Sequence, residues 1–240
     1  MHLGEAQSAS YLARRGQLET YFDRTAADAW KRLTSDAPVS GIRATVRAGR
    51  DRMRATLMSW LPDDLRGKRV LDAGCGTGAL AVEAARRGAH VVAIDLAGTL
   101  VSLAGERMPD DLREAGGHID WRVGDMTDPA LGQFDHVVGM DSLIHYPAPD
   151  MARVVAGLAA RSTGSVLFTF APRTPLLSVM HAAGRLFPRG DRAPSIEPVR
   201  ATTIGRLLHD DPAMAGWQPA RTLRIASGFY TSQALELVRS

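Results

Sequence analysis

The segment from Val70 to Gly78 carries the clearest chemical signal in the sequence. It reads VLDAGCGTG and stands between a short apolar run and a predicted helix over residues 79–87. Glycines at such a junction let the backbone bend sharply and approach a ligand closely, which is typical of nucleotide-binding loops. The spacing also fits the loose dinucleotide pattern, so the glycines alone do not choose a cofactor. We expect cofactor contacts at Gly74, Cys75, Gly76, Thr77 and Gly78.

Acidic residues beside the predicted strands separate the possible cofactors. Asp72 precedes the first glycine, where a carboxylate suits the cationic methionine end of S-adenosylmethionine and would repel a pyrophosphate. Asp95 ends the next predicted strand and can accept hydrogen bonds from both ribose hydroxyls of either cofactor. Asp125 follows the third strand and can accept from the adenine amino group while Met126 packs on the ring; alternatively, Asp125 starts a turn with Thr127. The set favours S-adenosylmethionine, with further contacts expected at Leu96, Gly124 and Asp141.

Short apolar runs alternate with helical stretches beyond Pro62. This alternation predicts an α/β fold with a doubly wound, mostly parallel sheet. Residues 224–238 alternate in polarity without a full helix between, which predicts antiparallel strands that close one edge. The runs expected to form the parallel strands are residues 69–71, 91–94, 121–123, 136–140 and 166–170.

Two parts of the chain lie outside this alternation. From Ile42 the apolar residues recur every three, four or seven positions opposite arginines, which predicts an amphipathic helix within a helical arm of residues 1–62. Residues 171–199 contain five prolines and predict an insertion that partly covers a pocket. We expect residues 63–240, with this insertion, to form one cofactor-binding domain.

The composition limits the classes of protein to which the chain can belong. Its 240 residues, 45% of them hydrophobic, can bury the core of one α/β domain with an extra segment. The single cysteine excludes an intramolecular disulfide, and neither an eighteen-residue apolar run nor a signal peptide is present, so a cytoplasmic protein is expected. The net charge of +3 resides in arginines, which suits an anionic ligand or peripheral contact with a membrane surface. Nucleic acid would require denser lysine and interleaved aromatic residues.

Two motifs that follow predicted strands carry a family resemblance. Residues 141–147 read DSLIHYP and residues 168–174 read FTFAPRT, while the predicted arm holds YFD at 21–23 and Trp30. In these motifs the chain closely resembles the magnesium-protoporphyrin O-methyltransferases. The resemblance implies a Rossmann-like class I methyltransferase with a seven-stranded sheet. It also implies methyl transfer from S-adenosylmethionine to one propionate of magnesium protoporphyrin IX in chlorophyll or bacteriochlorophyll synthesis, giving the monomethyl ester and S-adenosylhomocysteine, with magnesium present only within the porphyrin.

The resemblance also suggests catalytic and substrate-binding residues. His145 follows the fourth predicted strand, where this fold places reacting groups, and is expected to orient the propionate or contact the macrocycle; the alternative is a histidine that caps a loop. Family members often carry a tyrosine where this chain has Thr34, so the phenol candidates are Tyr21 and Tyr146. A propionate is already ionised near neutral pH, so positioning and desolvation matter more than a general base. An ordinary amphipathic helix is the alternative for the insertion. Substrate contacts are expected at Trp30, Arg173, Leu176, Met180, Arg185 and Phe187.

Three other functions stay open from the sequence. The first is a methyltransferase that acts on another small acid or a quinone-like substrate. The second is an NAD-linked oxidoreductase built on the same glycine loop, which Asp72 and Asp125 oppose. The third is a non-catalytic methyltransferase-like protein that binds a partner, and the resemblance implies the porphyrin-carrying subunit of magnesium chelatase as such a partner.

Overall fold

The computed structural model describes residues 7–25, 41–113, 116–173 and 195–240 of the chain. Within these ranges seven strands form a single sheet, and each of the apolar runs predicted to be a strand lies in or overlaps one of them. The strands are β1 (Arg69–Ala73), β2 (His90–Asp95), β3 (His118–Val123), β4 (Phe134–Gly139), β5 (Ser162–Phe170), β6 (Trp217–Ser227) and β7 (Tyr230–Arg239).

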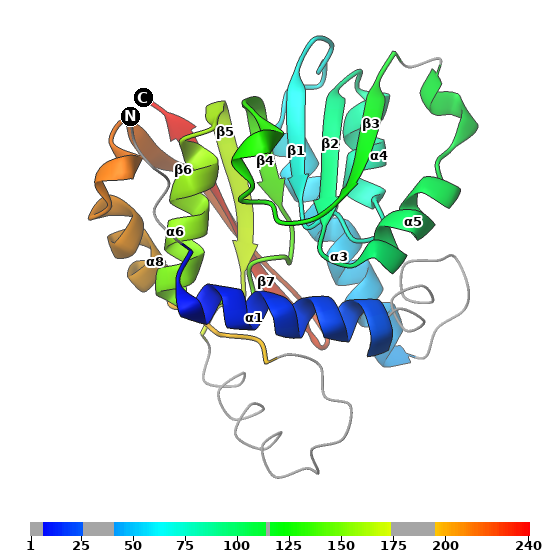
Figure 1. Ribbon diagram of the computed structural model, residues 1–240. Helices are drawn as coiled ribbons and strands as arrows, with labels where there is room; N and C mark the ends of the chain where they lie inside the picture. The colour runs from blue at the N-terminus through cyan, green and yellow to red at the C-terminus, as the bar shows by residue number, and fades with distance from the viewer. Residues whose placement is uncertain (1–6, 26–40, 114–115, 174–194) are drawn as a thin grey trace.

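The strand order is β3-β2-β1-β4-β5-β7-β6 (Figure 1). Strands β1 to β5 pair in parallel, whereas β7 lies between β5 and β6 and is antiparallel to both. The order changes direction at β1 and β4, and ligands of doubly wound sheets bind at the carboxyl ends of strands at such a point. The predicted doubly wound sheet with an antiparallel edge is therefore confirmed.

Helices surround this sheet, and their bounds agree with the periodicity of the sequence where a helix was expected. The helix predicted from Ile42 is present as α3 (Gly41–Trp60), and the helix predicted after the glycine loop is present as α4 (Ala79–Arg86), which ends one residue earlier than expected. Three short 3-10 helices, η2 (Asp110–Arg113), η3 (Pro129–Leu131) and η4 (Pro212–Met214), join longer elements. The longer helices are α1 (Ala9–Thr20), the π-helical turn η1 (Tyr21–Thr25), α3 (Gly41–Trp60), α4 (Ala79–Arg86), α5 (Gly98–Glu106), α6 (Ala148–Ala159) and α8 (Ala201–His209).

Alternate residues of the central strands face two different core layers. Val70 and Val91 are paired in the sheet and pack with residues of α3 and α4. Their neighbours Leu71 and Val92 are also paired and pack on the other face with residues of α6 and α8. Since successive side chains of a strand point to opposite faces, continuous apolar runs are what a sheet covered on both faces requires.

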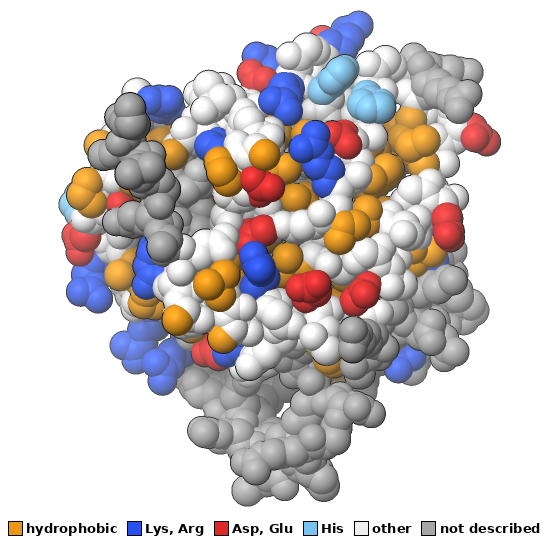
Figure 2. All heavy atoms as spheres, viewed as in Figure 1, with side chains coloured by type: hydrophobic (Ala, Val, Ile, Leu, Met, Phe, Trp, Pro, Cys, Tyr) orange, Lys and Arg blue, Asp and Glu red, His pale blue; other side chains and the backbone are white. Residues whose placement is uncertain are grey.

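Helix α1 lies across the carboxyl ends of the central strands (Figure 1). Its N-cap residue Ser8 accepts a hydrogen bond from the amide of Tyr11, and Tyr11 and Leu18 are its buried residues, two turns apart on one face. On the face of the molecule that α1 crosses, basic, acidic and hydrophobic side chains are interspersed (Figure 2). The sequence predicted a helical arm here but not the place of this helix over the sheet.

The predicted division at residue 62 is not tested by the structure and stays a prediction. Helix α3, the last part of the predicted arm, packs against β6, β7 and α4 and so contributes to the core. Most of the predicted insertion lies outside the described residues, and its two ends meet in a β-bridge between Pro172 and Val199. Among the described residues, no helix combines the length and apolar character needed to cross a membrane.

Candidate active site

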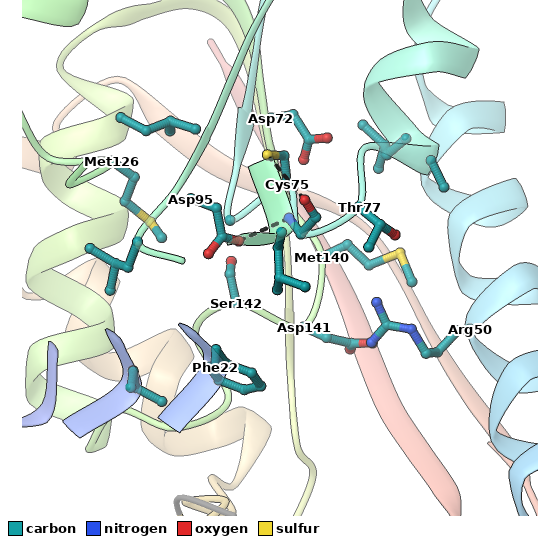
Figure 3. A pocket seen from close by; sticks show the side chains of 18 of the residues that line it. Phe22, Arg50, Asp72, Cys75, Thr77, Asp95, Met126, Met140, Asp141 and Ser142 are labelled. Carbon is teal, nitrogen blue, oxygen red and sulfur yellow. Dashed lines mark hydrogen bonds and ion pairs between the residues drawn. The ribbon is translucent and has the colours of Figure 1, made fainter. Parts of the chain in front are cut away.

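A cavity of about 350 Å³ lies at the carboxyl ends of β1, β2 and β4, and Leu18 of α1 also lines it. The glycine loop and Asp95 form one wall, and the segment that follows β4 forms another. Helix α3 adds basic side chains, and Phe22 of η1 lies across the cavity from Asp95 (Figure 3). The predicted cofactor residues that line the cavity are Asp72, Gly74, Cys75, Gly76, Thr77, Asp95, Leu96, Gly124, Met126 and Asp141.

The glycine loop has a backbone conformation that residues with side chains rarely adopt. Gly74, Gly76 and Gly78 have φ of 85°, 53° and 81°. A Cβ on Gly74 would lie 2.3 Å from the Cβ of Ser142, whereas a Cβ on Gly76 would meet no atom within 4 Å. Gly74 therefore permits close packing of two loops, and Gly76 leaves space on the cavity side. Gly78 does not line the cavity and instead precedes the first residue of α4.

Asp72 is a buried carboxylate without a full set of partners. Its side chain is 1% exposed, and its Oδ2 atom has no hydrogen-bond donor among the described residues. Burial, and next the nearby Asp95, raise the pKa of Asp72 to about 7. An acceptor of this kind on a cavity wall suits a ligand that brings a positive charge and N–H donors, as the methionine amino group of S-adenosylmethionine does.

Asp95 and Cys75 complete this wall of the cavity. The carboxylate of Asp95 accepts hydrogen bonds from the amides of Gly76 at 2.8 Å and Ala97 at 3.0 Å, which fixes its orientation at the end of β2 (Figure 3). Burial nevertheless raises the pKa of Asp95. Burial also raises the pKa of the Cys75 thiol, with Asp72 and Asp95 acting in the same direction, so this cysteine stays protonated.

Asp125 binds helix α1 instead of facing the cavity. Its carboxylate accepts hydrogen bonds from the hydroxyl of Tyr11 at 2.8 Å, from Arg15 at 2.9 Å and from Gln7 at 3.0 Å. It also accepts from the amide of Thr127 at 2.8 Å, which is the turn that the sequence offered as an alternative. Burial opposes its ionisation, but the hydrogen bonds, that of Arg15 first, lower the pKa of Asp125. Asp125 is not among the residues that line the cavity, and its contact with the adenine amino group stays a prediction.

Asp141, which follows the end of β4, also binds distant parts of the chain through its carboxylate. Its φ of 55° is unusual for a residue other than glycine. Its carboxylate accepts hydrogen bonds from Arg50 at 2.9 Å, from the hydroxyl of Tyr230 at 3.0 Å and from Ser232 at 3.0 Å (Figure 3). Its amide donates to the hydroxyl of Thr169 at 2.7 Å. These contacts stabilise the strained turn that places the neighbouring side chains in the cavity wall.

The structure brings His145 and Tyr146, but not Tyr21, to the cavity. His145 is 8% exposed, and its Nδ1 lies 3.3 Å from the carbonyl oxygen of Ser195. Tyr146 stacks on Tyr11 of α1 with ring centroids 5.0 Å apart, and burial raises the pKa of both phenols. Tyr21 instead packs edge-on against Phe22, with ring centroids 5.2 Å apart.

The predicted substrate residues are mostly beyond what the structure describes. Arg173 is described and exposed, and its amide donates to the carbonyl of Val199 at 3.0 Å. The other five lie outside the described residues and their roles stay predictions: Trp30, Leu176, Met180, Arg185 and Phe187.

Comparison with known proteins identifies the family. The family model for the magnesium-protoporphyrin IX methyltransferase C-terminus matches residues 139–239, and a methyltransferase domain model matches residues 70–162. The chain is 49% identical over 229 residues to the magnesium-protoporphyrin O-methyltransferase of Rhodobacter capsulatus, an alignment that covers 95% of this chain and 98% of the relative. The chain belongs to the magnesium-protoporphyrin O-methyltransferase family.

Other relatives agree with membership of the magnesium-protoporphyrin O-methyltransferase family. The Synechocystis enzyme of that name is 31% identical, with 92% of this chain and 94% of that protein covered. The crystal structure of the Synechocystis enzyme with bound S-adenosylhomocysteine has a TM-score of 0.81 at 28% identity and covers 94% of this chain and 100% of that chain. The predicted class I methyltransferase fold and the family resemblance are therefore confirmed, and the oxidoreductase alternative is set aside.

Two groups of residues in this family member escaped the sequence analysis. Arg47, Arg50 and Arg54 of α3 line the cavity, although the periodicity indicated only a basic helix face. Their signal was the same three- and four-residue spacing, but the partner surface could not be derived from it. Tyr11 and Arg15 of α1 carried no local motif, because their partner Asp125 is more than a hundred residues away.

Proposed function

We propose that this chain transfers a methyl group from S-adenosylmethionine to a propionate carboxylate of magnesium protoporphyrin IX, in chlorophyll or bacteriochlorophyll synthesis. The products are the monomethyl ester and S-adenosylhomocysteine. The observation that carries this proposal is the 49% identity to the Rhodobacter capsulatus enzyme over nearly the full length of both chains. The buried, partly unpartnered carboxylate of Asp72 in the cavity wall fits the charge of the cofactor.

We assign the cofactor to the cavity on the chemistry of its walls. Asp72 would receive the methionine amino group, and Asp95 would accept the ribose hydroxyls with the lone pairs that its two amide donors leave. Leu96, Gly124 and Met126 would contact the adenine ring from one side. The basic side chains of α3 would complement the carboxylate at the methionine end.

The residues of this chain would position and desolvate the reactants. When bound, the cofactor supplies a methyl group on a sulfonium. One propionate oxygen forms the new bond to the methyl carbon while the carbon–sulfur bond breaks and its electron pair goes to sulfur, so two opposite charges disappear. Phe22 and Leu18 would exclude water from the cavity, and His145 would orient the carboxylate. A dry cavity favours this step because charge is lost in it.

The porphyrin needs more room than the cofactor cavity provides. We propose that Tyr146 contacts the substrate beside His145, and that the insertion of residues 171–199 with Trp30 and Arg173 binds the macrocycle and its second propionate. We also propose a catalytic role for Tyr21 of the arm, peripheral contact with a membrane surface, and interaction with the porphyrin-carrying subunit of magnesium chelatase. They rest on the family resemblance and on the basic character of the chain, with a net charge of +3.

The decisive experiment is incubation of the purified protein with S-adenosylmethionine and magnesium protoporphyrin IX. We expect a pigment heavier by one methylene unit in the mass spectrum, formed together with S-adenosylhomocysteine. Caffeic acid and a demethylubiquinone analogue serve as parallel substrates for the small-acid and quinone-like alternatives. Methylation of one of these without methylation of the porphyrin would contradict the proposed substrate, and S-adenosylmethionine binding without turnover of any of them would favour the non-catalytic alternative.

A further inference from the structure

A chain of polar contacts joins helix α1 to His145. Arg14 of α1 donates to Glu197 at 2.9 Å and to the hydroxyl of Ser195 at 3.2 Å. The Ser195 hydroxyl donates to the same Glu197 carboxylate at 3.1 Å, and its carbonyl oxygen lies 3.3 Å from His145 Nδ1. The amide of Glu197 donates to the carbonyl of Ile144 at 2.8 Å. Residues 195–197 are therefore tied to α1 on one side and to the histidine segment on the other.

The contact with Ser195 favours one tautomer of the His145 ring. A carbonyl oxygen only accepts hydrogen bonds, so Nδ1 must carry the proton in this contact. In the neutral ring Nε2 is then the nitrogen with the lone pair. At 3.3 Å the hydrogen bond is near the long limit, so a small movement of Ser195 would break it. Whether Nε2 of the ring carries a lone pair or a proton thus depends on the position of residues 195–197.

The Arg14–Glu197 ion pair is a charged contact that joins that segment to α1. The segment belongs to no helix or sheet strand, and the side-chain contacts of Ser195 and Glu197 with Arg14 add to the backbone hydrogen bond between Glu197 and Ile144. The two side chains are 19% and 37% exposed, which shields the pair from water only in part. We therefore expect the ion pair to matter more for the position of residues 195–197 than for the free energy of unfolding, because it holds this short segment beside His145.

We propose that Arg14 and Glu197 are positioning residues that hold the Ser195 carbonyl against His145 and so fix the Nδ1–H tautomer and the orientation of its ring. The inference rests on the proposed function, in which His145 orients the propionate. Neither residue is among those that line the cavity. Their role is comparable to that of residues around metal sites, where a carbonyl or carboxylate accepts a hydrogen bond from a histidine ring nitrogen and so orients the ring.

The first test reads the tautomer directly and requires no porphyrin. The protein is labelled with ¹⁵N-histidine, and the His145 signals are identified as those that disappear in His145→Ala. We expect chemical shifts of the Nδ1–H form in the wild type and a shift toward the Nε2–H form in Arg14→Met, which keeps an unbranched stem like that of arginine but removes the guanidinium and its donors. Identical His145 shifts in the two proteins would overturn the proposal.

The second test measures methyl transfer in two backgrounds. Arg14→Met should lower kcat about tenfold in the wild-type background, because a misplaced group costs rate more than affinity, and should not lower it further in His145→Ala. Arg14→Lys, which keeps one charged donor, should recover part of the loss. Arg86→Met is the control: its partner is Asp111, and neither residue belongs to α1 or to residues 195–197, so its effect should be equal in both backgrounds.

An equal fall of kcat on Arg14→Met in both backgrounds would show that Arg14 does not act through His145 and would refute the positioning role. Failure of the proposed function is distinguishable from this result. In that case the wild type would form no ester at all, while the ¹⁵N shifts would still report whether Arg14 controls the ring of His145.

Discussion

The two walls of the cavity are built from the sequence in different ways. The wall formed by the glycine loop and Asp95 takes its residues from one β-α-β unit, between residues 72 and 95. The wall around His145 depends on α1 and on residues 195–197, and its Arg14–Glu197 contact joins residues 183 positions apart. The first wall follows from local backbone chemistry, whereas the second exists only when distant parts of the chain are packed together.

The largest effect of a substitution is expected at Asp72, which lies in the wall formed by the glycine loop and Asp95. Asp72→Asn keeps the shape but removes the charge, so we expect the dissociation constant for S-adenosylmethionine to rise about 50-fold, since a hydrogen bond to a charged group here contributes about 2.3 kcal/mol. The free energy of unfolding of the ligand-free protein at pH 8 should not fall, because a buried carboxylate without a full set of partners is itself unfavourable. Calorimetry and urea unfolding measure the two quantities.

The control for Asp72 is Asp64→Asn, which changes an exposed carboxylate paired with Arg66. It should leave cofactor affinity unchanged. If Asp72→Asn lowers stability and affinity together, the residue supports the fold of the loop and is not a binding group.

A smaller effect is expected from a single methyl group on the same wall. Gly76→Ala places a Cβ in space that no atom of the described chain occupies, at a φ of 53°. We expect the affinity for S-adenosylmethionine to fall about 20-fold through overpacking against the ligand, which costs about 2 kcal/mol. Isothermal titration measures this loss.

Gly67→Ala is a matched control, because Gly67 has a φ of 72° and also has no atom within 4 Å of an added Cβ. Both substitutions should lower the free energy of unfolding by about 1–2 kcal/mol, the cost of a left-handed residue with a side chain. Equal loss of affinity in the two variants would mean that backbone strain, not the cavity, explains the effect.

The pKa of Asp72 predicts how cofactor binding depends on pH. The group has a pKa of about 7 in the folded protein against 3.8 for an unperturbed aspartate, so the ligand-free protein loses stability from this group as pH rises from about 4 to about 7. Binding of a cation requires the ionised form, so affinity should rise about tenfold between pH 6 and pH 8. Titrations across this range check the rise, and Asp72→Asn should remove it; a flat wild-type profile would contradict the raised pKa.

The wall formed by the glycine loop and Asp95 could be predicted from sequence more fully than the wall around His145, and the reasons are physical. The strand runs, the amphipathic helix α3 and the glycine loop were predictable because each follows from periodicity or backbone conformation within a few residues. The partners of Asp125 and Asp141 were not, because a carboxylate in sequence does not reveal whether its donors come from a ligand or from Tyr11, Arg15, Arg50 and Tyr230. The same limit applies to Tyr21, whose motif marked the family but whose ring packs on Phe22.

The smallest expected effect concerns the contact of α1 with Asp125, which couples the two walls. Arg15→Met leaves Asp125 with the donors of Tyr11 and Thr127 but without its charged partner, and a partly exposed ion pair contributes less than about 1 kcal/mol. We expect about threefold weaker binding of S-adenosylmethionine and faster amide hydrogen exchange in α1, because Leu18 of this helix lines the cavity. Arg86→Met, which removes an exposed pair with Asp111, should change neither quantity. Faster exchange without weaker binding would mean that α1 can detach while the cofactor stays bound, and the two walls would then be independent.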